Sequence, residues 1–292
     1  MSGSASETAF EYRFTRLRLH GGAALAALIC VSAAMPPAFG QNNASPPDFS
    51  SDNMGWVSIG TDYVAVPGSL PPVTYDPAHR YVPNGSGEQS TFRVADIDNP
   101  LLTQFAKDGL KQSNDMVLNG FAMYARESRC WMTGVPAYLL NPAQPTFILQ
   151  EPKKITMMWQ MDQQVRHIYM NVPNSKNPKS SWYGESVGHY EGDTLVVDTV
   201  GQNTKTFIDN YRTPHSDKLH VVERFHLVEG GQKLQADITI EDPVALTQPL
   251  HVMHQWRKVQ GPMTESRCAD GEMVNPFGQQ AEPIPTAAKA DF

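Results

Sequence analysis

The architecture of this chain is clearest in the run Trp182-Tyr-Gly-Glu-Ser-Val-Gly-His-Tyr-Glu-Gly-Asp-Thr-Leu-Val-Val-Asp-Thr199. Short alternating apolar runs flank Glu191-Gly-Asp193, which supplies the permissive backbone that a tight reversal needs. We therefore predict a β-hairpin that turns at Gly192. Similar alternation predicts strands at residues 155–161, 165–170, 219–228, 233–241 and 250–258. Such spacing of antiparallel strands is typical of an all-β barrel or sandwich.

The N-terminal residues have the features of an export signal. Three arginines precede an apolar run at residues 21–34, and Ala38-Phe-Gly40 has the small residues that signal peptidase accepts. The alternative is a membrane anchor, but the run is short and two prolines follow it. We expect residues 1–40 to be a signal peptide, no integral membrane segment after its cleavage, and a periplasmic or secreted protein.

Composition limits the partners of the chain. It has 292 residues, of which 40% are hydrophobic and 18% are charged, and its net charge is −7. This acidic balance leaves no basic surface for nucleic acid. We therefore expect a small-molecule ligand and no nucleic acid.

The mature chain is predicted to have three regions. Residues 41–98 form an extended N-terminal segment with a first strand at Gly55-Trp-Val-Ser-Ile59. Residues 99–258 form the main β-barrel domain, with one helix that begins at an Asn99 N-cap and runs to about Asn114. Residues 259–292 form a C-terminal tail.

Two cysteines follow the predicted signal peptide, Cys130 and Cys268. An even number of cysteines in an exported protein favours a disulfide. Two unpaired thiols are the alternative.

Alternation places Glu223 on one strand face with Val221 and Phe225. A carboxylate facing inward there would be desolvated and could shuttle protons, unless an arginine holds it ionised. The structural alternative pairs Glu223 with an arginine on another strand, for which the candidates are Arg166, Arg212 and Arg257.

Asp198 shares a strand face with two valines and is predicted to be a second inward carboxylate. Two carboxylates in one cavity would permit acid and base roles, with His215 or His220 as the acid. His215, Asp217 and His220 are also metal-ligand types, but no fixed-spacing metal motif is present. We expect neither a metal nor an organic cofactor.

Gly184-Glu-Ser-Val-Gly188 matches the nucleophile elbow of serine hydrolases, Gly-x-Ser-x-Gly. That chemistry requires a helix after the serine, whereas here a hairpin is predicted. We interpret the match as chance.

Tryptophans and methionines supply broad apolar surface, either as core or as the walls of a ligand pocket. The predicted ligand-binding residues are Trp159, Trp182, Tyr183, His189, Arg224 and Trp256.

These motifs resemble those of a large, uncharacterised family of exported bacterial proteins. The resemblance covers about residues 47–258. It rests on the run quoted above, on Pro214-His-Ser-Asp-Lys-Leu-His-Val-Val-Glu-Arg-Phe225 and on Thr239-Ile-Glu-Asp-Pro243. Pro47-Asp-Phe-Ser50 and Gly55-Trp56 are similar to the family's opening segment. Cys130-Trp-Met-Thr-Gly-Val-Pro136 departs from its Cys-Leu-Pro-x-Gly-x-Pro motif.

The Gly-Trp pair in the first strand also resembles that of lipocalins. By analogy this implies a lipocalin-like barrel, and the family implies no established reaction.

Three functions are compatible with these features. The first is an exported protein that binds a small apolar or aromatic molecule in a barrel pocket. The second is an acid–base enzyme, an isomerase, lyase or hydrolase, that uses Glu223 or Asp198 with His215 or His220. The third is a structural envelope protein.

Overall fold

The computed structural model describes residues 46–50, 53–79, 93–119, 132–140, 144–160 and 164–264, which belong to one compact unit spanning residues 42–292. The predicted signal peptide, Cys130, Cys268 and the tail from residue 265 lie outside the described residues. Within the described ranges, no helix has the length and apolar character needed to cross a bilayer.

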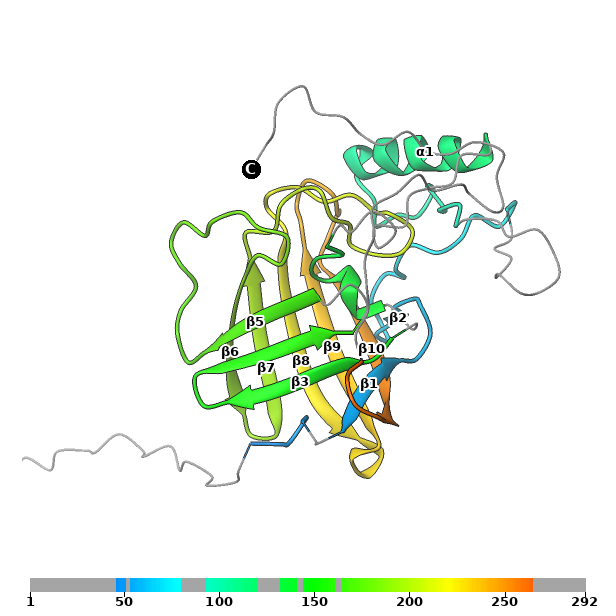
Figure 1. Ribbon diagram of the computed structural model, residues 1–292. Helices are drawn as coiled ribbons and strands as arrows, with labels where there is room; N and C mark the ends of the chain where they lie inside the picture. Colours follow the sequence, from blue (N-terminus) through cyan, green and yellow to red (C-terminus); the bar gives the residue numbers. More distant parts are fainter. Residues whose placement is uncertain are drawn as a thin grey trace, which may run out of the picture. The chain divides into compact units, whose positions relative to one another are not determined.

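The strands form a closed barrel (Figure 1). In sheet order they are β1 (Met54–Ser58), β3 (Thr146–Glu151), β4 (Lys154–Trp159), β5 (Gln164–Met170), β6 (Glu185–Glu191), β7 (Thr194–Val200), β8 (His220–Val228), β9 (Lys233–Glu241) and β10 (Leu250–Gln260). Antiparallel pairing of β1 with β10, from Met54↔Gln260 to Ser58↔Trp256, closes the ring. β2 (Val64–Ala65) adds a short pairing to β10. The predicted all-β barrel is confirmed, with nine strands in the part of the chain described.

The hairpin predicted at Gly192 is present. β6 and β7 pair from Glu185↔Val200 to Glu191↔Thr194, and Gly192 adopts φ +62° in the turn. Gly188 is required for packing, because a Cβ there would lie 2.9 Å from a methyl carbon of Ile168 on β5. Leu195, Val197 and Thr199 of β7 are completely buried.

One pairing departs from the antiparallel prediction. β5 and β6 are parallel, and they pair only from Ile168↔Ser186 to Met170↔Gly188. Residues 171–184 return the chain to the same end of the barrel, which a parallel connection requires and a tight hairpin cannot provide. Because the pairing is short, Gln164 to His167 of β5 pair with β4 but not with β6.

The helix lies further along the chain than predicted. α1 spans Gln104–Leu118, and its N-cap is Thr103, whose hydroxyl accepts from the Ala106 amide. The Asn99 side chain instead accepts from the Leu101 amide, 2.9 Å away, in a turn before the helix. Backbone pairing of Leu102 with Leu246 and contact of Gly109 with Pro214 hold α1 against the loops at one end of the barrel (Figure 1).

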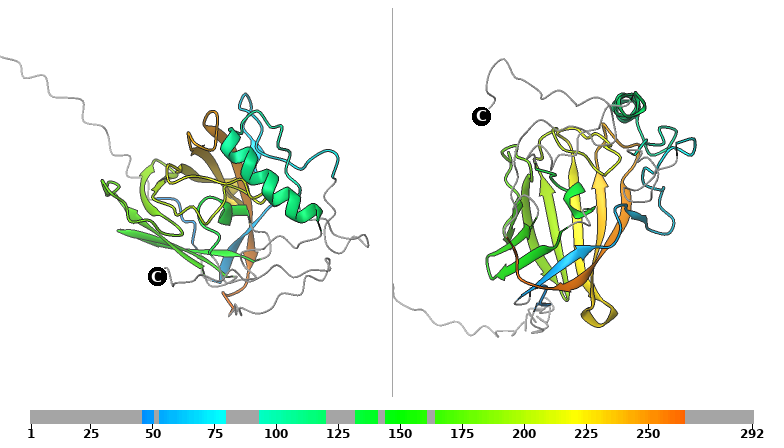
Figure 2. Two further views of the ribbon diagram at one scale, coloured as in Figure 1. Left: turned by 90° about the horizontal axis from the view of Figure 1, so that it is seen from above. Right: turned by 45° about the vertical axis from the view of Figure 1, so that its right-hand side comes forward.

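A short 3-10 helix, η2 (Ala137–Leu140), packs inside the ring of strands and is buried throughout (Figure 2). It belongs to the hydrophobic core together with Trp56, Phe225 and Trp256. The barrel interior is therefore filled by a segment that the sequence analysis did not identify.

Candidate functional site

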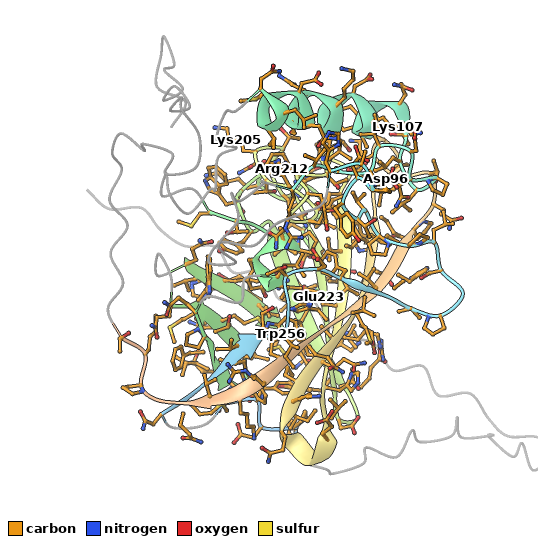
Figure 3. All side chains as sticks on the ribbon, turned by 90° about the vertical axis from the view of Figure 1, so that its right-hand side faces the viewer. Asp96, Lys107, Lys205, Arg212, Glu223 and Trp256 are labelled. Atoms are coloured by element: carbon orange, nitrogen blue, oxygen red, sulfur yellow. The ribbon has the colours of Figure 1, made fainter. Side chains whose placement is uncertain are left out.

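The interior of the barrel holds a buried ion pair between Arg166 of β5 and Glu223 of β8. Figure 3 labels Glu223 among the strands. Arg166 Nη1 donates to Glu223 Oε1 at 2.9 Å, and Nη2 makes a short contact with Oε2. The two side chains are 1% and 0% exposed. The prediction that Glu223 points inward is confirmed, and of the three candidate arginines Arg166 is its partner.

Neutral hydroxyl groups surround the guanidinium. Arg166 donates to Tyr138 at 2.7 Å, to Thr199 at 2.8 Å and to Ser186 at 3.1 Å. Burial lowers the pKa of Arg166, but the charge of Glu223 and the contacts with Tyr138 outweigh it and leave that pKa above its usual value. Both charges are thus satisfied within the barrel, and Glu223 is held by arginine as the structural alternative requires.

A small apolar cavity lies inside the barrel. The apolar cavity beside η2 has a volume of about 10 Å³, which is room for about one water molecule. Nine residues line it: Trp56, Tyr138, Leu139, Thr146, Ile148, Met157, Phe225, Leu234 and Trp256. Trp256, a predicted ligand-binding residue, therefore packs in the core, and Trp159 is likewise only 2% exposed.

A much larger groove lies on the outer wall, where β5 and β6 diverge. Its volume is about 910 Å³, within the range of small-molecule sites. The described lining residues come from β5, from the segment that leads into β6 and the start of β6, from the loop after β7 and from the segment before η2: Met132, Val165, His167, Tyr169, Lys179, Ser180, Ser181, Trp182, Tyr183, Gly184, Glu185, Ser186, Asn203 and Lys205. Two of the predicted ligand-binding residues, Trp182 and Tyr183, belong to this set.

Strand alternation and a short backbone ladder shape this groove. Val165 and Tyr169 point outward from β5 and are 42% and 49% exposed. On the opposite side, the Ser181 amide donates to the Gly201 carbonyl at 3.1 Å, and the Asn203 amide donates to the Ser181 carbonyl at 2.8 Å. The Trp182 segment is therefore fixed against the start of the loop that follows β7.

The charged residues that line the groove favour an anion. Lys205 Nζ lies 5.9 Å from the centroid of the Trp182 ring, a cation–π distance, and Lys179 also lines the groove. The carboxylate of the lining, Glu185, accepts from the Ser175 backbone amide and hydroxyl, the latter at 2.7 Å. Among the described residues, the groove thus combines aromatic surface with lysine side chains and a carboxylate, Glu185, that already has donors.

The prediction that Asp198 points inward is wrong. Leu195, Val197 and Thr199 occupy the inner face of β7, so Asp198 projects from the outer face and is 40% exposed. There it accepts from Asn174 at 2.5 Å and contacts His220 Nε2 at 3.1 Å. Alternation misassigned the face because valines stand on both sides of this strand.

His220 lies between two carboxylates on the outside of the barrel. Its Nδ1 is 3.0 Å from Glu241 Oε2, and its Nε2 contacts Asp198. The hydrogen bond with Asp198 is the main cause that raises the pKa of His220, to about 9. Because β8 alternates, His220 faces away from Glu223, so the predicted acid–base pairing of these two residues is not formed, whereas the predicted pairing of His220 with Asp198 brings the two side chains into contact.

The remaining predicted residues lie at two separate places, with His215 at one and Arg224 and His189 at the other. His215 is 2% exposed, and its Nε2 contacts the Thr206 hydroxyl at 2.7 Å. Arg224 donates to Glu191 at 2.6 Å on the outer face, where His189 Nε2 is also 3.1 Å from Glu191. In the described ranges, no three His, Cys, Asp or Glu side chains are placed to hold a metal ion.

Ser186 of the Gly-x-Ser-x-Gly match lies within β6 and is 2% exposed. Its hydroxyl contacts Thr199 at 3.0 Å and accepts from Arg166. A hairpin follows it, as predicted, and the helix of a nucleophile elbow is not formed there.

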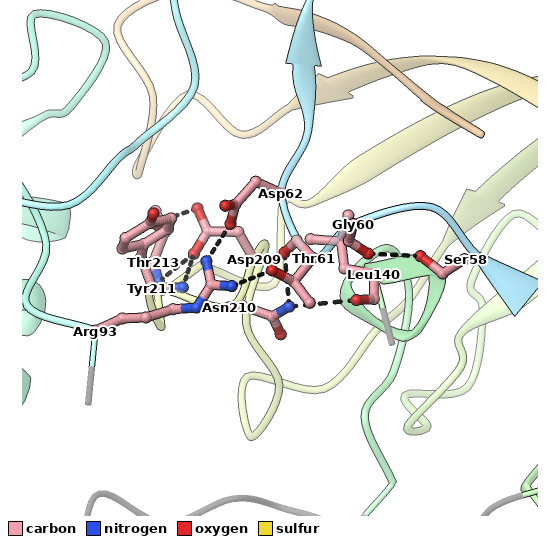
Figure 4. A network of polar contacts seen from close by, with 10 residues as sticks. All are labelled: Ser58, Gly60, Thr61, Asp62, Arg93, Leu140, Asp209, Asn210, Tyr211 and Thr213. Carbon is pink, nitrogen blue, oxygen red and sulfur yellow. Dashed lines mark hydrogen bonds and ion pairs between the residues drawn. The ribbon is translucent and has the colours of Figure 1, made fainter. Parts of the chain in front are cut away.

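A polar network joins the loops at one end of the barrel (Figure 4). Arg93 makes short contacts with Asp62 and Thr61, and Asn210 donates to the Thr61 carbonyl at 2.8 Å. Burial raises the pKa of Asp209 although three donors from Thr213 and Tyr211 stabilise its charge. Since these contacts tie the loops together, we interpret the network as structural.

Comparison of the chain with protein-family models, with curated proteins and with solved structures finds no match.

The sequence analysis missed most of the groove. Tyr169 could have indicated a binding surface, because it is a large aromatic residue on the outward face of an alternating strand. Nothing in the sequence indicates that β5 diverges from β6, since the divergence depends on the parallel pairing.

Proposed function

We propose that this chain is an exported, lipocalin-like binding protein for a small aromatic molecule, and that it binds this ligand in the groove between β5 and β6. The observation that carries the proposal is the size and chemistry of that groove. It has about 910 Å³ of space beside Trp182, Tyr183 and Tyr169, against about 10 Å³ in the apolar cavity beside η2. We therefore propose that the ligand site lies on the wall of the barrel and not within it.

The contacts of the carboxylates favour binding over acid–base catalysis. Glu223 is bound by Arg166 within the filled interior, and Asp198 and His220 contact each other on the outer face. A general acid and base must both reach the substrate. Glu223 lies on the inner face of the barrel wall and cannot share a substrate with the outward-facing His220. Asp198 and His220 do contact each other, but neither lines the groove.

A matched pair of tyrosine variants tests the proposal. Tyr169 is 49% exposed in the groove, and Tyr75 is 48% exposed outside its lining. Purified mature protein would be titrated with naphthalene and indole derivatives, and binding would be followed by native mass spectrometry and calorimetry. Tyr169→Ala should weaken binding by about ten-fold, the effect of removing one stacked aromatic contact, while Tyr75→Ala should leave the affinity unchanged.

Two results would contradict the proposal. One is saturable binding that Tyr169→Ala and Tyr75→Ala affect equally. The other is an absence of binding across the whole panel, which would favour a structural envelope protein.

A further inference from the structure

Directly behind the groove lies a buried amide with an unpaired donor. Gln164, the first residue of β5, is 1% exposed. Its Oε1 accepts from the Thr133 backbone amide at 3.0 Å and from the Tyr183 hydroxyl in a short contact. Its Nε2 has no hydrogen-bond partner. An unpaired buried amide donor is unfavourable and requires an explanation.

The position of this amide relates it to the groove. Oε1 and Nε2 belong to one planar group, so Nε2 lies close to the Tyr183 hydroxyl. Tyr183 lines the groove, and its ring packs edge to face on Tyr138 with centroids 5.8 Å apart. The half-buried Tyr183 side chain therefore connects the groove with the Gln164 amide.

A second buried amide lies beside the same groove. Gln202 is 2% exposed, and neither its Oε1 nor its Nε2 has a partner. Its backbone pairs with that of Ser181, and the next residue is Asn203, both of which line the groove. Buried amide groups with unpaired atoms thus lie next to lining residues of the groove at two places, Gln164 beside Tyr183 and Gln202 beside Ser181 and Asn203.

We propose that Gln164 determines the specificity of the groove and that the ligand class is an aromatic carboxylate. The Tyr183 hydroxyl turns away from Gln164, and Nε2 then donates to a carboxylate oxygen while the aromatic ring of the ligand packs against Trp182 and Tyr183. A carboxylate is favoured over a neutral carbonyl because Lys179 lines the groove and Glu185 already has donors. This inference rests on the proposed function of the groove.

The test compares 2-naphthoate with the uncharged 2-naphthalenemethanol, both titrated calorimetrically. Gln164→Glu keeps an acceptor for Thr133 and Tyr183 and replaces only the donor. It should weaken 2-naphthoate binding by ten-fold or more, the effect of losing a hydrogen bond to a charged group. Its affinity for 2-naphthalenemethanol should change by less than about three-fold.

Two further variants keep the test decisive if Gln164→Glu does not fold. Gln164→Met removes the donor without adding a charge and should give the same selective loss. Tyr183→Phe leaves Gln164 in place and removes the hydroxyl bonded to it, so 2-naphthoate should bind at least as tightly as to the wild type.

Each contrary result has a distinct meaning. If the Gln164 variants weaken both probes equally, or neither, the specificity role is refuted while the groove remains a binding site. If 2-naphthoate binds Tyr183→Phe several-fold more weakly than the wild type, the proposed access to Gln164 is refuted. If wild-type protein binds neither probe, the proposed function fails together with this inference.

Discussion

Replacing Glu223 by leucine should be among the most destabilising single changes in the barrel. The Arg166 side chain is 1% exposed, and the substitution removes its counter-charge. The other partners of Arg166, which are Tyr138, Ser186 and Thr199, are neutral. Breaking a fully buried ion pair costs about 3–5 kcal/mol. For a domain of this size, that loss lowers Tm by about 6–20 °C.

The double variant with Arg166→Met and Glu223→Leu should be more stable than Glu223→Leu alone. Ser186 and Thr199 keep their mutual contact at 3.0 Å, and the Tyr138 hydroxyl still donates to Met157 Sδ at 3.1 Å. The remaining hydroxyls therefore keep partners after both charges are removed, and we expect a coupling energy of about 2 kcal/mol or more in the double-mutant cycle.

Urea unfolding followed by tryptophan fluorescence measures each corner of the cycle. The control is Glu191→Leu, which removes an exposed partner of Arg224 and should cost under about 1 kcal/mol. If Glu223→Leu costs no more than this control, or if the two interior changes are additive, the buried pair does not stabilise the barrel as reasoned.

Three further changes test other parts of the structure. His220→Gln should remove the pH dependence of unfolding that the raised pKa of His220, about 9, creates. Protonated His220 stabilises the folded protein fully below pH 6.5, and this stabilisation is lost as pH rises through 9. At this half-exposed site it should stay under about 1 kcal/mol. His254→Phe should act at the acid end. Burial lowers the pKa of His254 to about 4, so wild-type stability should fall by up to about 3 kcal/mol as pH falls from 6.5 through 4. The Phe variant should lack that loss. An equal decline in the stability of the variant would refute the assignment to His254. Thr103→Ala should cost about 1 kcal/mol in urea unfolding because it removes the N-cap of α1, and a loss below about 0.3 kcal/mol would show that this cap contributes little.

Local alternation was sufficient to predict the hairpin at Gly192 and the inward position of Glu223. In β8 the inward residues Val221 and Phe225 are apolar, whereas the other face carries Arg224 and two histidines, so the two faces differ. In β7 both faces carry valine, and alternation could not decide which face Asp198 shares.

Features that depend on pairing between strands far apart in the chain could not be predicted from the sequence. The parallel pairing of β5 with β6 follows from the path of residues 171–184, whose composition indicates only a loop. Arg166 was one of three candidate partners for Glu223, and only the order of the strands around the barrel selects it. η2 is too short to show helical periodicity, yet it fills the space in which a ligand was expected.

The location of the ligand site is tested most directly by mapping amide chemical shifts while 2-naphthoate is added to labelled protein. We predict that the largest shifts fall on residues 165–169, 181–186 and 203–205, which border the groove. Shifts concentrated instead around Trp56, Phe225, Leu234 and Trp256 would place the ligand inside the barrel and contradict a binding site on its wall.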